Sequence, residues 1–383
     1  MQAPRRSGRP RGGPVISRAV ATRTNAMEQL DLPRIGMLPA GELDSIGDVP
    51  GVTVGHFTLA QGARQTGVTV VRPHEGDPFR NKVPAAATVL NGFGKSCGLI
   101  QVEELGVLET PIALTNTFAV GAVANAQIRQ AIAANPEIGR AWPTVNPLVF
   151  ECNDGYLNDI QAQAVTEAHY ELAWRGAASV FEQGSVGAGR GMSSFGFKGG
   201  IGSASRLAEA YPGQRYTVGA LVLSNFGQRS SMTIAGRPFG RRLAAAAARA
   251  DEPAGQPEMG SIILLLATDA PLDSRQLRRL SLRAGAGLAR TGSVFGHGSG
   301  DIALAFSTAY TIPHLAERGM PVQVMLHETR IDALFEAAAE AVEQAIVAAL
   351  WRAETVAGRD GHVRRAIREA VPQWRQWLAE TAF

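Results

Sequence analysis

The feature that most constrains the fold is a continuous apolar run that begins directly after a polar loop. Residues 261–267 read SIILLLA, and the ten residues before them, DEPAGQPEMG, contain two prolines and end in glycine. A short uninterrupted apolar run bounded by turn residues is typical of a strand that is covered on both faces. The chain is therefore expected to place layers of structure on both sides of a central sheet.

Other apolar or alternating runs predict further strands, and alanine-rich or amphipathic stretches predict helices. We expect strands at residues 48–55, 66–72, 85–91, 111–116, 216–225 and 301–309. We expect helices at residues 119–135, 159–175, 241–250, 273–290, 331–354 and 364–380. No linker separates two cores, so the pattern predicts a single domain with a sheet-on-sheet core covered by helices on both sides.

The composition indicates a globular protein and argues against nucleic-acid binding. Of the 383 residues, 45% are apolar and 19% are charged. The formal net charge of +3 depends on residues 1–26, which hold six arginines and no acid, so the remaining residues carry −3. A mildly acidic body lacks the basic footprint of a nucleic-acid-binding surface. We expect residues 1–31 to form a disordered basic extension; the alternatives are a transit-like segment or translation from Met27.

The sequence does not have the patterns of a membrane span, a secretory signal, a disulfide scaffold or a phosphate-binding loop. The apolar runs are too short to span a bilayer, and none follows the arginines as in a secretory signal, so we expect a cytoplasmic protein without membrane contact. Cys97 and Cys152 are too few for a disulfide scaffold and are expected to be small buried thiols. The glycine-rich residues 184–203 do not fit a P-loop, and we expect mobile or tightly turning loops there.

The histidines do not predict a metal site, and we expect no cofactor. The seven histidines have no metal-binding spacing such as His-Glu-x-x-His. His297 lies close to Ser299 and could act as a general base. However, His297 and Asp301 occupy the positions where a Gly-x-Ser-x-Gly nucleophile elbow requires glycine. We therefore interpret His297 as a bystander.

Gly260 and Ser261 together suggest a self-cleaving site. Glycine leaves its carbonyl open to attack and tolerates strained backbone angles. The Ser261 hydroxyl could attack that carbonyl, and water could resolve the resulting ester. Cleavage would free an α-amino group with a reference pKa of about 7.7–8.0, which can take the proton from the hydroxyl of the same residue. From these residues alone, an ordinary serine at a strand edge is the alternative.

A series of collinear motifs runs through the chain from about Leu32 onward. The motifs are DVPGVTVGH (48–56), NGFGK (91–95), GLIQVEELG (98–106), LETPIALTNT (108–117), DGYLND (154–159), GS (260–261), ATDAPL (267–272), GSGD (298–301) and GRDG (358–361). With these motifs the chain resembles the L-aminopeptidase/D-esterase and β-peptidyl aminopeptidase family, which also includes a nylon-oligomer hydrolase. The resemblance implies a four-layer α/β/β/α sandwich like that of N-terminal-nucleophile hydrolases, with different connectivity.

The resemblance also implies roles for individual residues. Ser261 would be both the nucleophile and the residue that cleaves the chain after Gly260. Ser299 and Asp301 would form a hydrogen-bonding relay beside it, although some relatives carry glutamate at the position of Asp301. Asn225 would be the oxyanion-hole donor.

Two further positions concern the substrate. The resemblance implies that Glu151 binds the free amine of the substrate through a charge-assisted hydrogen bond. Asn153 stands where some relatives have a tyrosine that supports catalysis, so a tyrosine role is in doubt here. Tyr156 matches a tyrosine that we interpret as structural.

The resemblance implies a self-processing aminopeptidase or amidase that acts on short peptides, amino-acid amides or esters, including D- or β-residues. One domain over residues 32–383 would be cut into a larger fragment (32–260) and a smaller one (261–383). The cleaved heterodimers would form a tetramer. The alternatives are an acyltransferase of the ornithine-acetyltransferase type, which favours threonine as nucleophile, and an inactive binding homologue.

Overall fold

The computed structural model describes residues 32–249 and 259–380, which belong to one compact unit that starts at Leu32. The expected basic extension at residues 1–31 and most of the polar loop before Ser261 lie outside the described residues. Within the two described ranges, no helix is both long enough and apolar enough to cross a membrane.

Two sheets form the centre of the unit. The larger one has the strand order β13 (Ile312–Pro313), β3 (Asn81–Gly92), β12 (Gly298–Ser307), β11 (Met259–Thr268), β10 (Gln214–Asn225) and β9 (Gly200–Tyr211), and β4 (Val107–Leu108) also pairs with β3. The smaller one has the order β1 (Thr53–Gln61), β2 (Arg64–Arg72), β5 (Ile112–Asn116) and β6 (Leu148–Cys152). Strand β11 is parallel to β12 and antiparallel to β10, so it lies inside the larger sheet.

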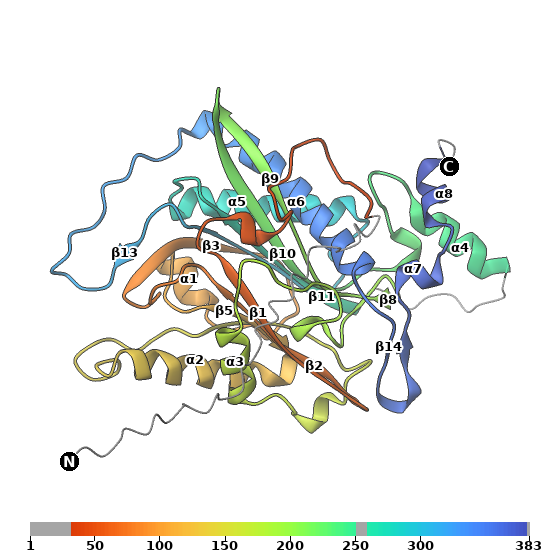
Figure 1. Cartoon of the computed structure of the whole chain (residues 1–383), viewed down its shortest axis with the longest axis horizontal. Coiled ribbons are helices and arrows are strands. Elements are labelled where there is room, and N and C mark those ends of the chain that lie inside the picture. The colour runs from red at the N-terminus through yellow and green to blue at the C-terminus, as the bar shows by residue number, and fades with distance from the viewer. Residues whose placement is uncertain (1–31, 250–258, 381–383) are drawn as a thin grey trace, which may run out of the picture. The chain divides into compact units, whose positions relative to one another are not determined.

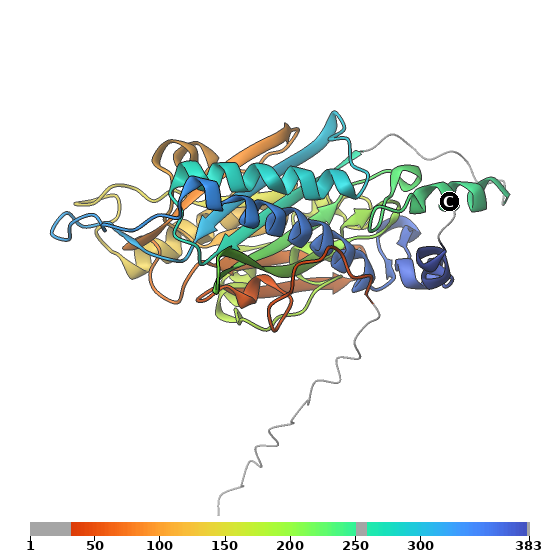
Figure 2. The same ribbon diagram turned by 90° about the horizontal axis from the view of Figure 1, so that it is seen from above.

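Helices cover the outer face of each sheet (Figures 1 and 2). Helices α5 (Ser274–Arg290) and α6 (Asp332–Trp351) pack on the larger sheet, whereas α2 (Val120–Ala134) and α3 (Glu167–Arg175) pack on the smaller one. The remaining helices are α1 (Leu99–Leu105), α4 (Phe239–Arg249), α7 (Ile367–Ala370) and α8 (Trp374–Ala379). Two small hairpins consist of β7 (Ser193–Ser194) with β8 (Phe197–Lys198) and of β14 (Val356–Ala357) with β15 (Val363–Arg364).

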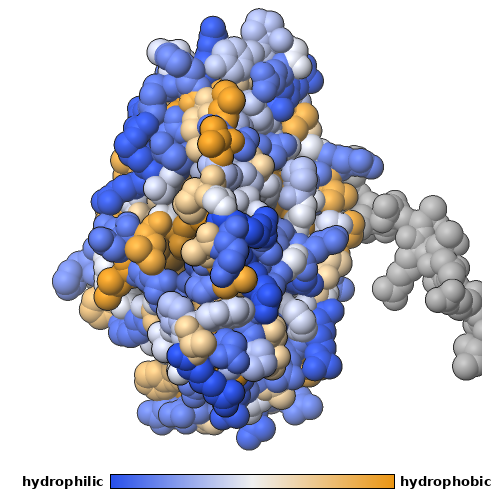
Figure 3. Space-filling view, turned by 90° about the vertical axis from the view of Figure 1, so that its left-hand side faces the viewer, coloured by the Kyte–Doolittle hydropathy of each residue, from blue (hydrophilic) through white to orange (hydrophobic). Residues whose placement is uncertain are grey.

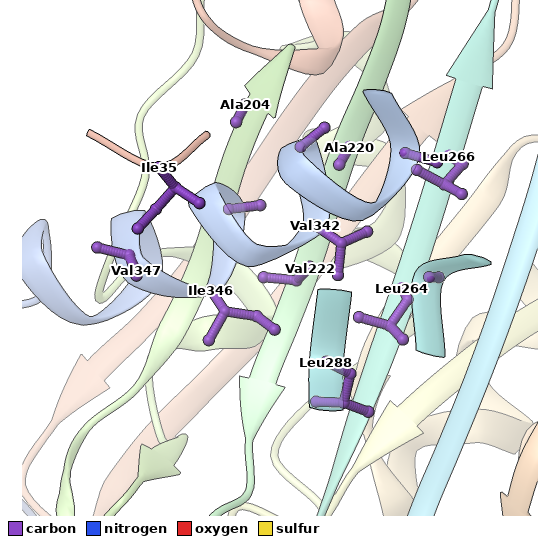
Figure 4. Close-up of a cluster of buried hydrophobic side chains, with 14 of the residues drawn as sticks. Ile35, Ala204, Ala220, Val222, Leu264, Leu266, Leu288, Val342, Ile346 and Val347 are labelled. Carbon is purple, nitrogen blue, oxygen red and sulfur yellow. The ribbon is translucent and has the colours of Figure 1, made fainter. Parts of the chain in front are cut away.

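The apolar run in β11 is covered on both faces, as its sequence predicted. Ile262, Leu264 and Leu266 belong to the core cluster between the larger sheet and its helices. Figure 4 shows Leu264 and Leu266 with Val342 of α6 in this cluster. The alternate residues, including Ile263, belong to the cluster between the two sheets. Because side chains alternate along a strand, a strand between two apolar layers needs this uninterrupted run.

The four-layer α/β/β/α arrangement is the one that the sequence predicted, but some element boundaries were wrong. The helix expected at 159–175 begins at Glu167, because Thr166 and His169 form a capping box there. The helix expected at 364–380 is two short helices, α7 and α8, with Pro372 between them. Proline disfavours helical backbone angles in the residue before it, and Val371 has φ −133° and ψ 70°.

The glycine-rich residues 184–203 form tightly turning, closely packed structure, which agrees with the second of the two forms expected there. Most of this stretch is buried, and it contains the β7–β8 hairpin and the start of β9. A Cβ atom at Gly202 would lie 1.9 Å from the Ala345 carbonyl oxygen of α6. The glycines are therefore needed because backbone segments approach closely here.

Replacing Gly202 by alanine should destabilise the fold, because α6 would have to move away from β9. Overpacking of this kind costs about 1–3 kcal/mol, so the midpoint of thermal unfolding should fall by several degrees. Gly121 in α2 is the matched control: it is exposed, and a Cβ atom there would meet nothing within 4 Å. Gly121→Ala should leave the midpoint unchanged or raise it. Equal midpoints for the two variants would contradict this packing.

Candidate active site

Ser261 lies near the start of β11, between the ends of two neighbouring strands. It pairs with Asn225 of β10 on one side and with Gly300 of β12 on the other. Its side chain is 6% exposed, and its Oγ accepts a hydrogen bond from the Gly300 amide at 3.2 Å. Alternation along β11 places the hydroxyl on the same face as Ile263, which is the face between the two sheets.

Position 260, directly before Ser261, must be glycine for β11 to pair with β10 as it does. A Cβ atom at Gly260 would lie 2.1 Å from the Asn225 carbonyl oxygen and 2.9 Å from the Phe226 Cα. The parallel ladder with β12 continues through this position, where Gly260 pairs with Ser299. The bond expected to be cleaved is therefore held inside a paired strand rather than in a loop.

Ser299 and Asp301 form a buried pair in β12. Both side chains are fully buried, and the Ser299 Oγ donates a hydrogen bond to Asp301 Oδ1 at 2.5 Å. Alternation along β12 puts them on the face opposite to Ile302, whereas the Ser261 hydroxyl lies on the Ile302 face. The Ser299 and Asp301 side chains therefore lie nearer to the backbone of residue 261 than to its hydroxyl. Cleavage would create an α-amino group on this backbone.

Asn225 is the last residue of β10, as expected for a residue at a strand end, and its amide is held from two sides. Its Oδ1 accepts from the Ser193 amide at 2.8 Å, and its Nδ2 donates to the Asn153 carbonyl oxygen at 3.0 Å. A side-chain amide has two N–H groups. One N–H of Asn225 is used by Asn153, and the other can donate to a negatively charged oxygen beside Ser261.

Glu151 lies one residue before the end of β6 and is 3% exposed. Its Oε1 accepts from the Lys95 amide at 2.7 Å, and its Oε2 accepts from the Thr117 hydroxyl. A Cβ atom at Gly94 would lie 3.6 Å from Glu151 Oε1 and 3.8 Å from the Gly300 Cα. The Glu151 carboxylate is thus close to Gly300, which contacts Ser261. The two groups that donate hydrogen bonds to this carboxylate are electrically neutral.

The two cysteines are unsuited to nucleophilic catalysis. Cys152 is fully buried at the end of β6; burial, together with the charges of Glu151, Asp301 and Asp154, raises the pKa of its thiol well above the ordinary value. Cys97 is half-buried, and burial raises the pKa of its thiol as well.

The other candidate residues lie around this centre. Asn153 is exposed and contributes its carbonyl oxygen to Asn225, while its own Oδ1 accepts from the Gly155 amide at 2.9 Å. The ring of His297 lies 6.1 Å from that of Phe93. Tyr156 stacks on His362 with ring centroids 4.6 Å apart.

Three residues of the site were not identified from the sequence. Thr117 binds Glu151, Ser193 binds Asn225, and the Asn91 side chain donates to the carbonyl oxygens of Gly296 (3.0 Å) and Ser299. Asn91 and Thr117 lie in motifs on which the family resemblance rests, so their place in these motifs could have indicated that they belong to the site. Ser193 contributes a backbone amide, which no residue pattern identifies.

This geometry agrees with the comparisons with known proteins. The family model described as Peptidase family S58 matches residues 44–364. The chain belongs to peptidase family S58. It is 38% identical over 370 residues to β-peptidyl aminopeptidase BapA of Sphingosinicella microcystinivorans, and the match covers 91% of each chain.

Solved structures give the same result for this S58 chain. A β-aminopeptidase of Burkholderia sp. superposes with a TM-score of 0.83 at 41% identity, covering 93% of this chain and 99% of that one. The L-aminopeptidase D-Ala-esterase/amidase of Ochrobactrum anthropi, described as a variant of the Ntn hydrolase fold, gives 0.80 at 35% identity, covering 91% and 98%. The S58 chain is therefore a serine aminopeptidase with an Ntn-hydrolase-like fold.

Asp154 is a buried acid next to the loop that supports Asn225. Its side chain is fully buried, and its Oδ1 accepts from the Asn158 side-chain Nδ2 at 3.0 Å. Burial raises its pKa to about 7, although the hydrogen bond from Asn158 and the charge of Lys198 oppose the shift. The ionised form of Asp154 is thus disfavoured in the folded protein.

The replacement Asp154→Asn should stabilise this S58 chain increasingly as the pH rises. The folded pKa of about 7 exceeds the ordinary value of 3.8. Between these values the folded state binds a proton that the unfolded state has lost, so the free energy of unfolding falls with rising pH, and the penalty is complete above about pH 7. Asparagine keeps the oxygen acceptor without this penalty. The melting temperature of the variant relative to wild type should rise from pH 5 to pH 8; a difference that does not change with pH would contradict the assignment.

Proposed function

We propose that this S58 chain cleaves itself between Gly260 and Ser261, and that Ser261 then hydrolyses the bond after the first residue of short peptides, amides or esters. The observation that carries the proposal is the position of Ser261 between Asn225 and Gly300, beside the buried Ser299–Asp301 pair. A nucleophile, a candidate oxyanion donor and a polar pair next to the future amine meet at one place.

Self-cleavage would begin with attack of the Ser261 Oγ on the Gly260 carbonyl carbon. The bond between that carbon and the Ser261 nitrogen breaks, and the proton lost by the hydroxyl ends on the nitrogen. Water then hydrolyses the Gly260 ester, which leaves a carboxylate on Gly260 and a free amine and hydroxyl on Ser261. Pairing of both residues with β12 favours this reaction, because it fixes their relative orientation.

Turnover would use the new amine as the base. With a pKa near 7.7–8.0, it takes the proton from the Ser261 hydroxyl as the oxygen attacks the substrate carbonyl. The second N–H of Asn225 stabilises the negatively charged oxygen, the bond to the leaving group breaks, and the proton passes to the leaving amine. Water then hydrolyses the acyl ester on Ser261, which releases the acid and restores the free hydroxyl. Ser299 and Asp301 orient the α-amino group through their hydrogen bonds.

The proposed substrate carries a free amine that binds Glu151. The carboxylate is buried and accepts hydrogen bonds from two neutral donors, so an ammonium group would supply the missing positive charge. The names of the S58 relatives, β-peptidyl aminopeptidase and β-aminopeptidase, favour β-aminoacyl groups among the acceptable first residues.

The alternatives have less support. Serine at position 261 and the aminopeptidase relatives count against an ornithine-acetyltransferase-type acyltransferase, and the retained site residues count against an inactive homologue. We also propose a cytoplasmic tetramer of cleaved heterodimers that needs neither metal nor cofactor. Apolar patches lie among hydrophilic residues in Figure 3, and Val322 and Val324 are 100% and 86% exposed, which favours self-association.

Purified wild-type protein should run as two fragments on a denaturing gel. Residues 1–260 and 261–383 scale to about 27 and 13 kDa of the 40.4 kDa chain. Amino-terminal sequencing of the smaller fragment should read Ser-Ile-Ile-Leu, and Ser261→Ala should remain one chain because it has no hydroxyl to attack Gly260. Active protein that consists only of the intact chain would overturn the proposal.

The variant Glu151→Gln separates amine binding from chemistry. Self-cleavage should continue, since the uncleaved chain presents no free amine at this position. Hydrolysis of β-alanine p-nitroanilide should fall about ten- to a hundredfold, which corresponds to a charge-assisted hydrogen bond of about 1.5–3 kcal/mol.

The control is the same substrate with a blocked amine. It should be a poor substrate for the wild type and respond little to the mutation. Equal losses on both substrates, in a protein that no longer cleaves itself, would show that Glu151 is a structural acid.

A further inference from the structure

The orientation of the Asn225 amide depends on two neighbouring segments. The Ser193 amide donates to Oδ1, and the Asn153 carbonyl oxygen accepts from Nδ2. A side-chain amide that turns over exchanges its donor and acceptor ends, and the two contacts together allow only one orientation. The free N–H of Asn225 is therefore aimed only as accurately as the segments around Ser193 and Asn153 are held.

A hairpin near the end of the chain holds the segment that follows Asn153. This hairpin contains β14, β15 and the residues between them. Arg359 Nε donates to the Gly155 carbonyl oxygen at 2.6 Å, and the Arg359 amide donates to that of Leu157 at 2.8 Å. His362 Nδ1 lies 2.8 Å from the Tyr156 carbonyl oxygen. Residues 155–157 are thus bound at three successive carbonyl groups.

Arg364 at the end of this hairpin touches both segments. Its Nε donates to the Ser193 Oγ at 3.2 Å. Its guanidinium carbon lies 3.5 Å from the centre of the Tyr156 ring, which is a cation–π contact. The side chain is half-buried, and burial lowers its pKa from the ordinary value. One planar group therefore connects the two segments whose backbone atoms bind Asn225.

We propose that Arg364 is a positioning residue, which aims the Asn225 side chain at the reacting carbonyl through Ser193 and the segment at Tyr156. The inference rests on the proposed role of Asn225. It gives a function to a residue that belongs to the smaller fragment, whereas Asn225, Ser193 and Tyr156 belong to the larger one. The contact would serve both reactions, because self-cleavage and turnover develop negative charge on a carbonyl oxygen beside Ser261.

Arginine has two properties that lysine cannot supply together at this place. Its planar guanidinium stacks on an aromatic ring, and its Nε points sideways as a donor while the stack is maintained. The variant Arg364→Lys retains the charge but not this combination. Arg364→Ala removes both contacts, while the hydrogen bonds of Arg359 to the carbonyl oxygens of Gly155 and Leu157 remain.

The test compares Arg364→Ala and Arg364→Lys with Arg365→Ala, a neighbouring exposed arginine. For β-alanine p-nitroanilide, Arg364→Ala should lower kcat about ten- to a hundredfold with KM changed less than about twofold, since an oxyanion donor acts mainly in the transition state. Self-cleavage should slow in parallel. Arg364→Lys should recover only part of the loss, and Arg365→Ala should match the wild type.

A double-mutant cycle tests the route through Ser193. If Arg364 acts through the Ser193 hydroxyl, the double variant Arg364→Ala/Ser193→Ala should be no slower than Arg364→Ala alone. Melting temperatures of all variants show whether the hairpin stays folded. A lower kcat that follows a lower melting temperature and is fully recovered in Arg364→Lys would assign Arg364 a merely structural role and overturn the inference.

Asn225→Ala separates this inference from the proposed function. If that variant keeps wild-type kcat and self-cleavage, the oxyanion assignment itself is wrong, and Arg364 has nothing to position. If Asn225→Ala is slow but Arg364→Ala has the kcat and the cleavage rate of the wild type, the proposed function stands and only the role of Arg364 is rejected.

Discussion

The pairing of β11 with β10 and β12 at Gly260 and Ser261 is the constraint on which the rest of the site depends. Strand β10 approaches so closely that a side chain at position 260 would overlap the Asn225 carbonyl oxygen. The same pairing places Ser261 opposite Asn225 and Gly300, and it places Gly260 opposite Ser299. One backbone arrangement therefore exposes a peptide bond to attack and surrounds the attacking residue with hydrogen-bonding groups.

The polar residues of the site lie on two different faces of the central strands. The hydroxyl of Ser261 lies on the face between the sheets, close to Gly300 and, through it, to Glu151. The Ser299–Asp301 pair lies on the other face, next to the backbone of residue 261. In the proposed mechanism the pair would orient the amine that serves as base, while Asn225 and Glu151 would bind the reacting oxygen and the amine of the substrate.

The sequence predicted the layers and the central strands, because a strand buried on both faces must be apolar throughout, as residues 262–267 are. It did not predict β9, since the close contact of Gly202 with α6 replaces side-chain packing and leaves no hydrophobic pattern. Ser261 was predicted from a short family motif, and Asn225 and Glu151 were predicted as positions that correspond to functional residues of the family. Ser193 and Arg364 contact the site from segments that are far apart in the sequence. Ser193 uses a backbone amide and Arg364 a stacked guanidinium, so no spacing of residue types in the sequence predicted these contacts.

The central claim is that the amine released by cleavage activates the Ser261 hydroxyl, and labelling with a fluorophosphonate tests it most directly. The sample is wild-type protein, in which a small fraction of the chains would still be uncleaved. After labelling, the modified amino acid is located by mass spectrometry. The account predicts one phosphonyl group on the hydroxyl of Ser261 at the start of the smaller fragment, and no label on the uncleaved chain. Label on Ser261 of the uncleaved chain, or on Ser299 in either form, would contradict it.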